Sequence, residues 1–227
     1  MKVQLLIPAA GMGRRLGYDQ PKALAPLAGA PLILRTLERL YSFCTDVPAL
    51  LIVPPGYETD FRAALDCSCE EVRLVPGGEE RRDSVAAGLA ALDTDTGIVV
   101  IHDAARPFPP EESIRTAITS AENIGAATLA MPVSDTILLE DGNGFLQDTP
   151  DRTSVWACQT PQVFRKDVIR EAYAKMRSSD VPCTDDATLV RLAGFPVRLI
   201  TGHSLNFKIT TKWDLMFAEY LLERGLI

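Results

Sequence analysis

The stretch LLIPAAGMGRRLGYDQPKAL, residues 5–24, joins a short apolar segment to a glycine-rich, basic loop. The run from Val3 to Ile7 is apolar and shows no helical period, so it predicts a buried β-strand. Open α/β sheets bind ligands at the carboxyl ends of such strands. Glycines let backbone N–H groups close around an anion, and cations neutralise it. The loop therefore predicts a polyphosphate site, built from these residues: Gly11, Gly13, Gly17, Arg14, Arg15 and Lys22.

Two common phosphate-binding loops do not match this stretch. A Walker A loop needs a Gly-Lys pair followed by Ser or Thr, and a dinucleotide fingerprint needs a third glycine where Leu16 stands. A dinucleotide pyrophosphate relies mainly on a helix N-terminus, whereas three cations favour a triphosphate or a phosphate that meets one. The alternative is a surface loop that is basic by coincidence, and the acidic balance of the chain argues against it.

Composition narrows the class of protein. The 227 residues are 47% hydrophobic, which suits one large domain with a proper core. A net charge of −7 argues against nucleic acid as a partner. Neither a long apolar segment nor a signal-peptide pattern is present, so we expect a cytoplasmic protein without a membrane anchor. The five cysteines are expected to be reduced, and with only two histidines a structural zinc site is not expected.

Strand and helix patterns alternate along most of the chain. The predicted strands are 3–7, 49–53, 71–75, 98–101, 126–131, 155–158 and 197–200. The predicted helices are 31–43, 57–65, 82–92, 111–122, 166–176, 185–192 and 212–222. This alternation predicts a mostly parallel, twisted sheet covered by helices on both faces.

Residues 133–153, here called the arm, break the alternation. Asp141-Gly142-Asn143-Gly144 is a strong turn signal between Thr136–Glu140 and Phe145–Thr149, which predicts a β-hairpin. An isolated two-stranded hairpin is barely stable in water, so it must rest on another surface. Two readings stay open at this point: a flap on its own domain, or an arm that clasps a second subunit.

Polar residues follow the third predicted strand. Gly77 and Gly78 would bring backbone close to a flat base or a ribose. The Ser84 hydroxyl could donate to a ligand carbonyl, or bond to backbone as early-helix serines do. Asp83 is expected to be a helix N-cap or a first-turn acid rather than a catalyst.

A second polar group, residues 102–107, follows the apolar strand 98–101. A carboxylate in this place is costly unless it is paired or binds a cation. Asp103 could therefore hold Mg²⁺ or a substrate hydroxyl, or form a structural pair with Arg106. His102 has no nearby acid or nucleophile and is expected to be a packed histidine. Near the end of the chain, Lys208 is a candidate phosphate ligand, with a surface lysine as the alternative, and Thr184-Asp185-Asp186 has the pattern of a helix cap.

Taken in order, these motifs resemble the 2-C-methyl-D-erythritol 4-phosphate cytidylyltransferases of the non-mevalonate isoprenoid pathway. Each motif is weak alone, and the ordered set, which spans nearly the whole chain, is specific. The matching segments are 8–16 with 21–22, 77–85, 102–107, 135–136, 151–152, 160–162, 184–186 and 206–210. Ala23-Leu24 stand where the family usually has Gln and an aromatic residue, and Glu79 stands where it often has Asp. Sister enzymes acting on ribitol 5-phosphate share much of the pattern.

The resemblance implies a three-layer α/β fold of the Rossmann-like nucleotidyltransferase type, in one domain with residues 133–153 as a dimerisation arm. It implies the reaction of CTP with 2-C-methyl-D-erythritol 4-phosphate, with Mg²⁺, to give the CDP-alcohol and pyrophosphate. Ribitol 5-phosphate or another polyol phosphate is the alternative acceptor. A sensor that binds nucleotide without turnover, and a sugar-1-phosphate enzyme using UTP or GTP, are more distant readings.

The same resemblance assigns roles to residues, with no protein ligand for the metal. The catalytic residues would be Arg15 and Lys22. The nucleotide-binding residues would be Pro8, Ala9, Ala10, Gly11, Gly13, Gly78, Glu79, Ser84 and Ala104. The substrate-binding residues would be Asp103, Arg106, Thr136, Arg152, Thr160 and Lys208. Thr136 and Arg152 would reach the neighbour's active site in a homodimer.

Overall fold

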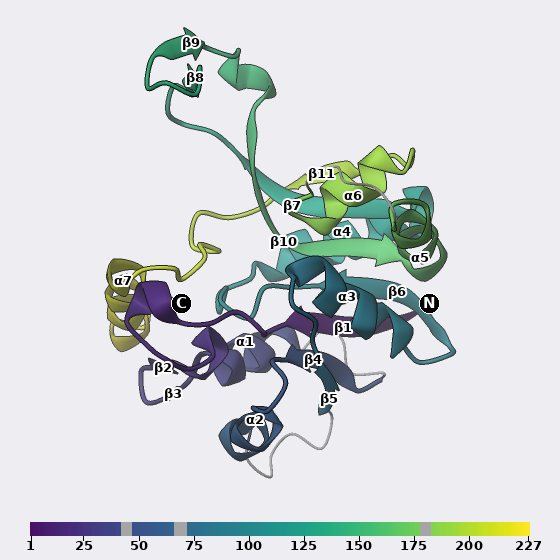
Figure 1. Ribbon diagram of the computed structural model, residues 1–227, viewed down its shortest axis with the longest axis vertical. Coiled ribbons are helices and arrows are strands. Elements are labelled where there is room, and N and C mark those ends of the chain that lie inside the picture. The colour runs from purple at the N-terminus through teal and green to yellow at the C-terminus, as the bar shows by residue number, and fades with distance from the viewer. Residues whose placement is uncertain (42–46, 66–71, 178–182) are drawn as a thin grey trace.

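The computed structural model describes residues 1–41, 47–65, 72–177 and 183–227. A seven-stranded sheet runs through them in the order β11-β7-β10-β6-β1-β4-β5 (Figure 1). All neighbours pair in parallel except β10, which is antiparallel to both β6 and β7. The strands of this sheet are β1 (Lys2–Pro8), β4 (Ala49–Val53), β5 (Val72–Pro76), β6 (Thr96–Ile101), β7 (Ala126–Pro132), β10 (Trp156–Arg165) and β11 (Arg198–Thr201). The expected mostly parallel sheet is confirmed.

Helices cover the sheet on both faces (Figure 1). The helices are α1 (Leu32–Leu40), α2 (Glu58–Leu65), α3 (Arg81–Ala90), α4 (Glu111–Ile124), α5 (Lys166–Lys175), α6 (Asp186–Leu192) and α7 (Lys212–Glu223). One core packs α1, α2 and α4 against one face of the sheet, and a second packs α3, α5 and α6 against the other. Successive strand residues point to opposite faces, so Leu5 lies in the first core and Leu6 in the second. The predicted three-layer α/β fold is therefore confirmed.

The strand order places a binding crevice at β1. The chain passes from β1 to β4 and β5 on one side, and then returns to place β6 on the other side of β1. In doubly wound sheets, ligands bind outside the carboxyl ends of the strands where the order reverses in this way. The loops after β1 and β6 meet at this point, and the loop after β5 lies at the same edge because these strands are parallel.

Most predicted elements differ from the observed ones by one or two residues at their ends, and a few differ more. Strand β10 continues to Arg165, well beyond the predicted end at Cys158, because residues 162–165 pair with β6 and residues 162–164 with β7. A small hairpin of β2 (Pro26–Leu27) and β3 (Ala30–Pro31) was not predicted. The predicted helix end at 42–43 and strand start at Glu71 lie outside the described residues.

The arm projects from the body between β7 and β10 (Figure 1). It is a hairpin as predicted, but its strands β8 (Leu139–Glu140) and β9 (Leu146–Asp148) are shorter than expected. The Asp141 carboxylate accepts hydrogen bonds from the backbone N–H groups of Asn143 and Phe145, which fixes the turn. The arm's strand residues are exposed, so no packed face extends the pairing further.

The loop after β1 and helix α7 share a third, smaller core beside the sheet. Leu16 packs there with Ala218 of α7 and with Ile209, which precedes that helix. Thr211 caps α7 by accepting a hydrogen bond from the Asp214 backbone N–H. The glycine-rich loop is thus supported from behind by the carboxyl-terminal segment. None of the helices in the described part of the chain is both long and apolar enough to span a membrane.

Candidate active site

An open pocket of about 240 Å³ lies at the carboxyl ends of β1, β5 and β6. Four separate segments of the chain form it: the loop after β1, the loop and helix start after β5, the loop after β6, and the segment before α7. Its lining residues are Pro8, Ala9, Ala10, Gly11, Lys22, Ala23, Gly78, Glu79, Glu80, Arg81, Ser84, Asp103, Ala104, Ala105 and Lys208. The residues predicted from separate sequence motifs therefore meet in one place.

The first wall of the pocket offers backbone donors. Within the described residues, the N–H groups of Ala10 and Gly11 have no hydrogen-bond partner. The carbonyl of Gly11 accepts from the Lys22 N–H at 2.9 Å, which folds the loop back and brings Lys22 to the pocket. Gly13 closes this loop instead of facing the pocket, because its N–H donates to the Gln20 carbonyl at 2.9 Å. Two consecutive unpaired N–H groups beside a lysine form a site for an anion.

Lys22 lies among other cations, and this alters its pKa. Burial lowers the pKa of Lys22 to about 8, and the nearby charges of Lys208, Arg15 and Arg106 act in the same direction. Asp103 partly opposes the shift. The positive charge of Lys22 is poorly compensated by the protein, so a bound anion would stabilise the charged form of this lysine.

The second wall is the start of α3. The Glu80 side chain accepts from the backbone of Asp83, and the Asp83 carboxylate accepts from the Glu80 N–H, which together make a capping box. Asp83 is thus the first-turn acid that the sequence predicted. The buried Ser84 hydroxyl accepts a hydrogen bond from the Gly78 N–H at 3.2 Å. The predicted bond to backbone is confirmed, and donation of the hydroxyl hydrogen to a ligand stays a prediction.

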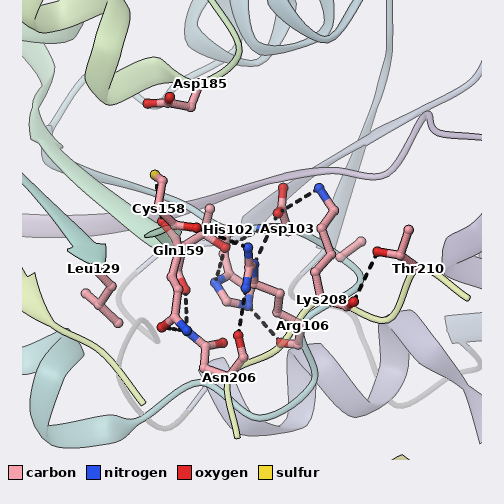
Figure 2. Close-up of polar contacts among 12 residues, drawn as sticks. His102, Asp103, Arg106, Leu129, Cys158, Gln159, Asp185, Asn206, Lys208 and Thr210 are labelled. Atoms are coloured by element: carbon pink, nitrogen blue, oxygen red, sulfur yellow. Dashed lines mark hydrogen bonds and ion pairs between the residues drawn. The ribbon is translucent and has the colours of Figure 1, made fainter. Parts of the chain in front are cut away.

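Asp103 stands at the third wall between two cations (Figure 2). Its Oδ2 atom lies 3.0 Å from Lys208 Nζ and 3.3 Å from Arg106 Nε. Burial would raise the pKa of Asp103, but Lys208 and Arg106 hold it well below its usual range. No described residue donates to the other oxygen, Oδ1. Asp103 is therefore a charged carboxylate with one oxygen left for a ligand.

Arg106 and His102 support this loop (Figure 2), and Thr160 bonds to both His102 and the Asp103 N–H. Arg106 donates to the Asn206 carbonyl at 2.7 Å, which joins the segment before α7 to the loop after β6. His102 is fully buried, and burial lowers its pKa to about 4, so the ring is neutral at pH 7. Its Nε2–H donates to the Arg106 carbonyl, while Nδ1 accepts from the Thr160 hydroxyl. His102 is the packed histidine that the sequence predicted.

Some predicted site residues do not line the pocket. Thr160 is buried, and its hydroxyl accepts from the Asp103 N–H at 3.0 Å, so it positions Asp103. Arg15 is exposed and lies near enough to Lys22 to affect its pKa. Thr136 and Arg152 are exposed on the arm, where Arg152 donates to the Ser134 carbonyl. Gly13 and Arg106 do not line the pocket either, because Gly13 closes the loop after β1 and Arg106 bonds to Asp103 and to the Asn206 carbonyl.

Four pocket residues were not assigned a role from the sequence, namely Ala23, Glu80, Arg81 and Ala105, and two of them are charged. Glu80 and Arg81 line the pocket at the start of α3. The sequence signal was present, because both lie inside the matched segment 77–85, but charged residues at a helix start are more often caps than ligands. Arg81 is held by an ion pair with Asp186, which is 105 positions away in the sequence and cannot be found from local spacing.

The described residues contain no cluster of three or more His, Cys, Asp or Glu side chains that could hold a metal alone. Mg²⁺ commonly keeps several waters and binds through one or two carboxylates together with substrate phosphates. The pocket offers this donor set when a triphosphate is present, since Asp103 Oδ1 is free. Cys158 and Cys183 are free thiols, and the remaining cysteines lie outside the described residues.

Comparison with known proteins gives a consistent result. The model of the 2-C-methyl-D-erythritol 4-phosphate cytidylyltransferase family matches residues 3–224. The enzyme of that name from Pelotomaculum thermopropionicum is 41% identical over 225 residues, covering 98% of this chain and 94% of the relative. The one from Nocardia farcinica is 43% identical over 223 residues, with the same coverage.

Solved structures agree. The 4-diphosphocytidyl-2C-methyl-D-erythritol synthase of Anaerococcus prevotii superposes with a TM-score of 0.85 at 29% identity, covering 98% of both chains. The 2-C-methyl-D-erythritol 4-phosphate cytidylyltransferase of Thermus thermophilus superposes with a TM-score of 0.81 at 34% identity, covering 98% of this chain and all of that one. With a family match over nearly its whole length, this chain belongs to the 2-C-methyl-D-erythritol 4-phosphate cytidylyltransferase family.

Proposed function

We propose that this protein transfers CMP from CTP to 2-C-methyl-D-erythritol 4-phosphate. The products are 4-diphosphocytidyl-2-C-methyl-D-erythritol and pyrophosphate, in non-mevalonate isoprenoid biosynthesis. The observation that carries the proposal is the single pocket in which backbone donors, Lys22, the Gly78–Ser84 wall and the Asp103–Lys208 pair meet. Family membership favours methylerythritol phosphate over ribitol 5-phosphate as the acceptor.

The wall formed by the start of α3 selects the nucleotide. Gly78 and the buried Ala9 line the part of the pocket where a flat base would lie, and the Ser84 hydroxyl donates to the cytosine carbonyl while accepting from Gly78. Glu79 accepts from the exocyclic amine, which a uracil lacks. Pro8 and Ala104 line the pocket where the ribose would lie.

The chemical difficulty is the mutual repulsion of two anions. The phosphate of the acceptor is already a nucleophile, and it attacks the α-phosphorus of CTP so that pyrophosphate leaves. Catalysis then consists of positioning and charge stabilisation, as in other phosphoryl transfers. The Ala10 and Gly11 N–H groups and Lys22 stabilise the charge that builds on the α-phosphate, and Arg15 closes over the loop to join them.

The acceptor binds at the third wall. Asp103 Oδ1 accepts a hydrogen bond from an acceptor hydroxyl, while Lys208, which is 42% exposed, faces the acceptor phosphate. Arg106 and Thr160 hold Asp103 in this orientation. The fixed positive charges lower the cost of bringing the second phosphate into the pocket.

The arm completes the site from a second subunit. The chain forms a homodimer in which residues 133–153 of each subunit extend over the other, and Thr136 and Arg152 approach the partner's acceptor site. Support comes from the arm's exposure, since Leu138, Phe145 and Leu146 are each at least 60% exposed on a hairpin too small to be stable alone. Residues 1–227 otherwise form one nucleotidyltransferase domain.

Mg²⁺ would be held by the phosphate oxygens of CTP and by waters, because the open oxygen of Asp103 is given to the acceptor hydroxyl. Bound there, it neutralises phosphate charge and makes pyrophosphate a better leaving group.

A pyrophosphate-release assay tests the proposal. The four ribonucleoside triphosphates are each paired with 2-C-methyl-D-erythritol 4-phosphate, ribitol 5-phosphate and a sugar 1-phosphate, in the presence of Mg²⁺. The proposal expects CTP with methylerythritol phosphate to give the highest kcat/KM. Faster turnover with ribitol 5-phosphate, a preference for UTP or GTP, or no release from any pair would overturn it.

A further inference from the structure

Arg81 lines the pocket and forms an ion pair with Asp186, a residue that does not line it. Arg81 is the first residue of α3, and its side chain is 33% exposed. Its Nη2 atom donates to Asp186 Oδ2 at 2.7 Å, and the Asp186 side chain is 1% exposed. The Tyr173 hydroxyl donates to the other oxygen, Oδ1, at 2.6 Å. A buried carboxylate with both oxygens bonded therefore holds the arginine in one orientation.

The backbone of Asp186 is fixed to the sheet. The buried side chain of Gln162, on β10, accepts hydrogen bonds from the backbone N–H groups of Asp186 and Ala187, each at 3.0 Å. This contact anchors the start of α6 directly on the central sheet. The ion pair therefore connects the pocket to a rigid frame and not to a mobile surface group.

Stability alone does not account for this arrangement. Replacing a buried ion pair with apolar residues is often neutral or stabilising, since two charges must be taken out of water. Burial lowers the pKa of Arg81, but the Asp186 carboxylate more than offsets this and raises it, so the guanidinium is always charged. Burial and then the charge of Asp186 raise the pKa of Tyr173, which keeps its hydroxyl as a donor.

The guanidinium has donors left for a ligand. An arginine carries five N–H groups, and among the described residues only Asp186 accepts from Arg81. Arg81 lines the pocket at the start of α3, and its charge lies near enough to Asp103, across the pocket lining, to lower the pKa of that carboxyl. A fixed planar cation with free N–H groups matches the oxygens of a nucleoside triphosphate.

We infer that Asp186 and Tyr173 are positioning residues for nucleotide binding, which hold Arg81 so that its free N–H groups meet the phosphates of CTP. The identity of the nucleotide rests on the proposed function. Helices α5 and α6, on one face of the sheet, thereby contribute to a pocket that their residues do not line.

The dissociation constant of Mg·CTP, measured by calorimetry, tests this inference. Arg81→Met and Asp186→Asn should each weaken binding by about tenfold, the loss of one charge-assisted contact. The double variant should bind no worse than Arg81→Met, because Asp186 acts through Arg81. Tyr173→Phe should weaken binding by a smaller factor, and should have no effect when Arg81 is already Met.

Asp185→Asn is the matched control. Asp185 caps the same helix by accepting from the Thr188 N–H, but it does not contact Arg81. Because Asn is also a good N-cap residue, the substitution should leave the dissociation constant unchanged and the fold intact. If Asp185→Asn weakened CTP binding as much as Asp186→Asn, the position of α6 and not the contact with Arg81 would be responsible, and the inference would be overturned. The same would follow if the double variant bound CTP more weakly than Arg81→Met by the full factor that Asp186→Asn shows alone. Unchanged binding in Arg81→Met would overturn it as well.

Two features keep this test decisive. If Asp186→Asn fails to fold, the pair of Tyr173→Phe and Arg81→Met with their double variant gives the same comparison. CTP binding is measured without the acceptor, so it does not depend on the proposed reaction. If the protein binds CTP but shows no turnover with methylerythritol phosphate, the proposed function is wrong and the inference about Arg81 still holds.

Discussion

Lys208 Nζ lies 3.0 Å from Asp103 Oδ2, and this contact joins the segment before α7 to the loop after β6 (Figure 2). Arg106 bonds the same oxygen and also the Asn206 carbonyl, so the two segments are joined twice. The negative charge is thereby fixed among cations that would otherwise repel one another. We consider this cluster to be the acceptor half of the active site.

Removal of Lys208 should affect the acceptor and spare the nucleotide. Lys208→Met should raise KM for methylerythritol phosphate by roughly 10- to 100-fold, the loss of one hydrogen bond to a charged group. The dissociation constant of CTP should change little. Lys212→Met removes a nearby exposed lysine outside the pocket and serves as the control. Steady-state kinetics with each substrate varied would decide, and a larger effect on CTP than on the acceptor would contradict the assignment.

The pKa of Lys22 predicts a pH dependence of activity. Because burial and neighbouring cations lower this pKa to about 8, the free enzyme loses the Lys22 proton as the pH rises through 8. The cationic form meets the α-phosphate, so kcat/KM for CTP should fall above pH 8 by about tenfold per pH unit. Bound CTP is an anion and favours the charged lysine, so the fall in kcat should begin at a higher pH.

Lys22→Arg is the control for this profile, since arginine stays charged throughout the range. Its rates will be lower because the geometry differs, but the fall above pH 8 should disappear. A fall that persists unchanged in Lys22→Arg would show that another group titrates.

Substitutions at Gly78 and Gly11 should distinguish an effect on packing from an effect on CTP binding. A Cβ added at Gly78 would overlap the Cβ of Asp83, so Gly78→Ala should cost about 1–3 kcal/mol and lower Tm by several degrees. A Cβ added at Gly11 meets nothing within 4 Å, yet Gly11 lines the pocket. Gly11→Ala should keep the wild-type Tm and weaken CTP binding. Thermal melts with and without CTP would test the pair, and an equal loss of Tm in both variants would be the contrary result.

Many residues of this site could be predicted because short sequence patterns determine the strands and the loops that carry them. The apolar run 3–7 followed by glycines and cations predicted both β1 and the loop at its end. Asp103 and Lys208 were separate candidates in the sequence, and hydrogen bonds between the segment before α7 and the loop after β6 bring them together. The partner of Arg81 could not be predicted, because Asp186 reaches it through the packing of α6 on the sheet.

Other differences between the sequence prediction and the structure also arise from contacts between distant parts of the chain. The sequence pattern ended one strand at Cys158, whereas the sheet extends β10 to Arg165 through pairing on both sides. The arm shows the reverse, since its predicted strands shortened where no surface of the same chain supports them. Gly13 and Thr160 were assigned to ligands from their motifs, and in the folded chain their polar groups bond to protein.

The arm predicts complementation between subunits. Arg152→Ala chains lack an arm residue, and Lys22→Ala chains lack a pocket residue. If Arg152 serves the partner's pocket, a mixed dimer contains one site with both residues intact, and mixing two inactive proteins should restore about a quarter of wild-type activity or less. Each variant mixed with wild type is the control for subunit exchange. Full exchange without any recovery would place Arg152 in its own subunit's site.

The most direct test of the account is the separation of turnover from CTP binding in Lys22→Met. The variant's kcat for pyrophosphate release is measured with saturating methylerythritol phosphate, and its dissociation constant for Mg·CTP by calorimetry. Because the charge on the α-phosphate peaks in the transition state, kcat should fall by about 100- to 1000-fold while the dissociation constant changes only a few-fold. Near-normal kcat in a folded Lys22→Met protein would contradict the account.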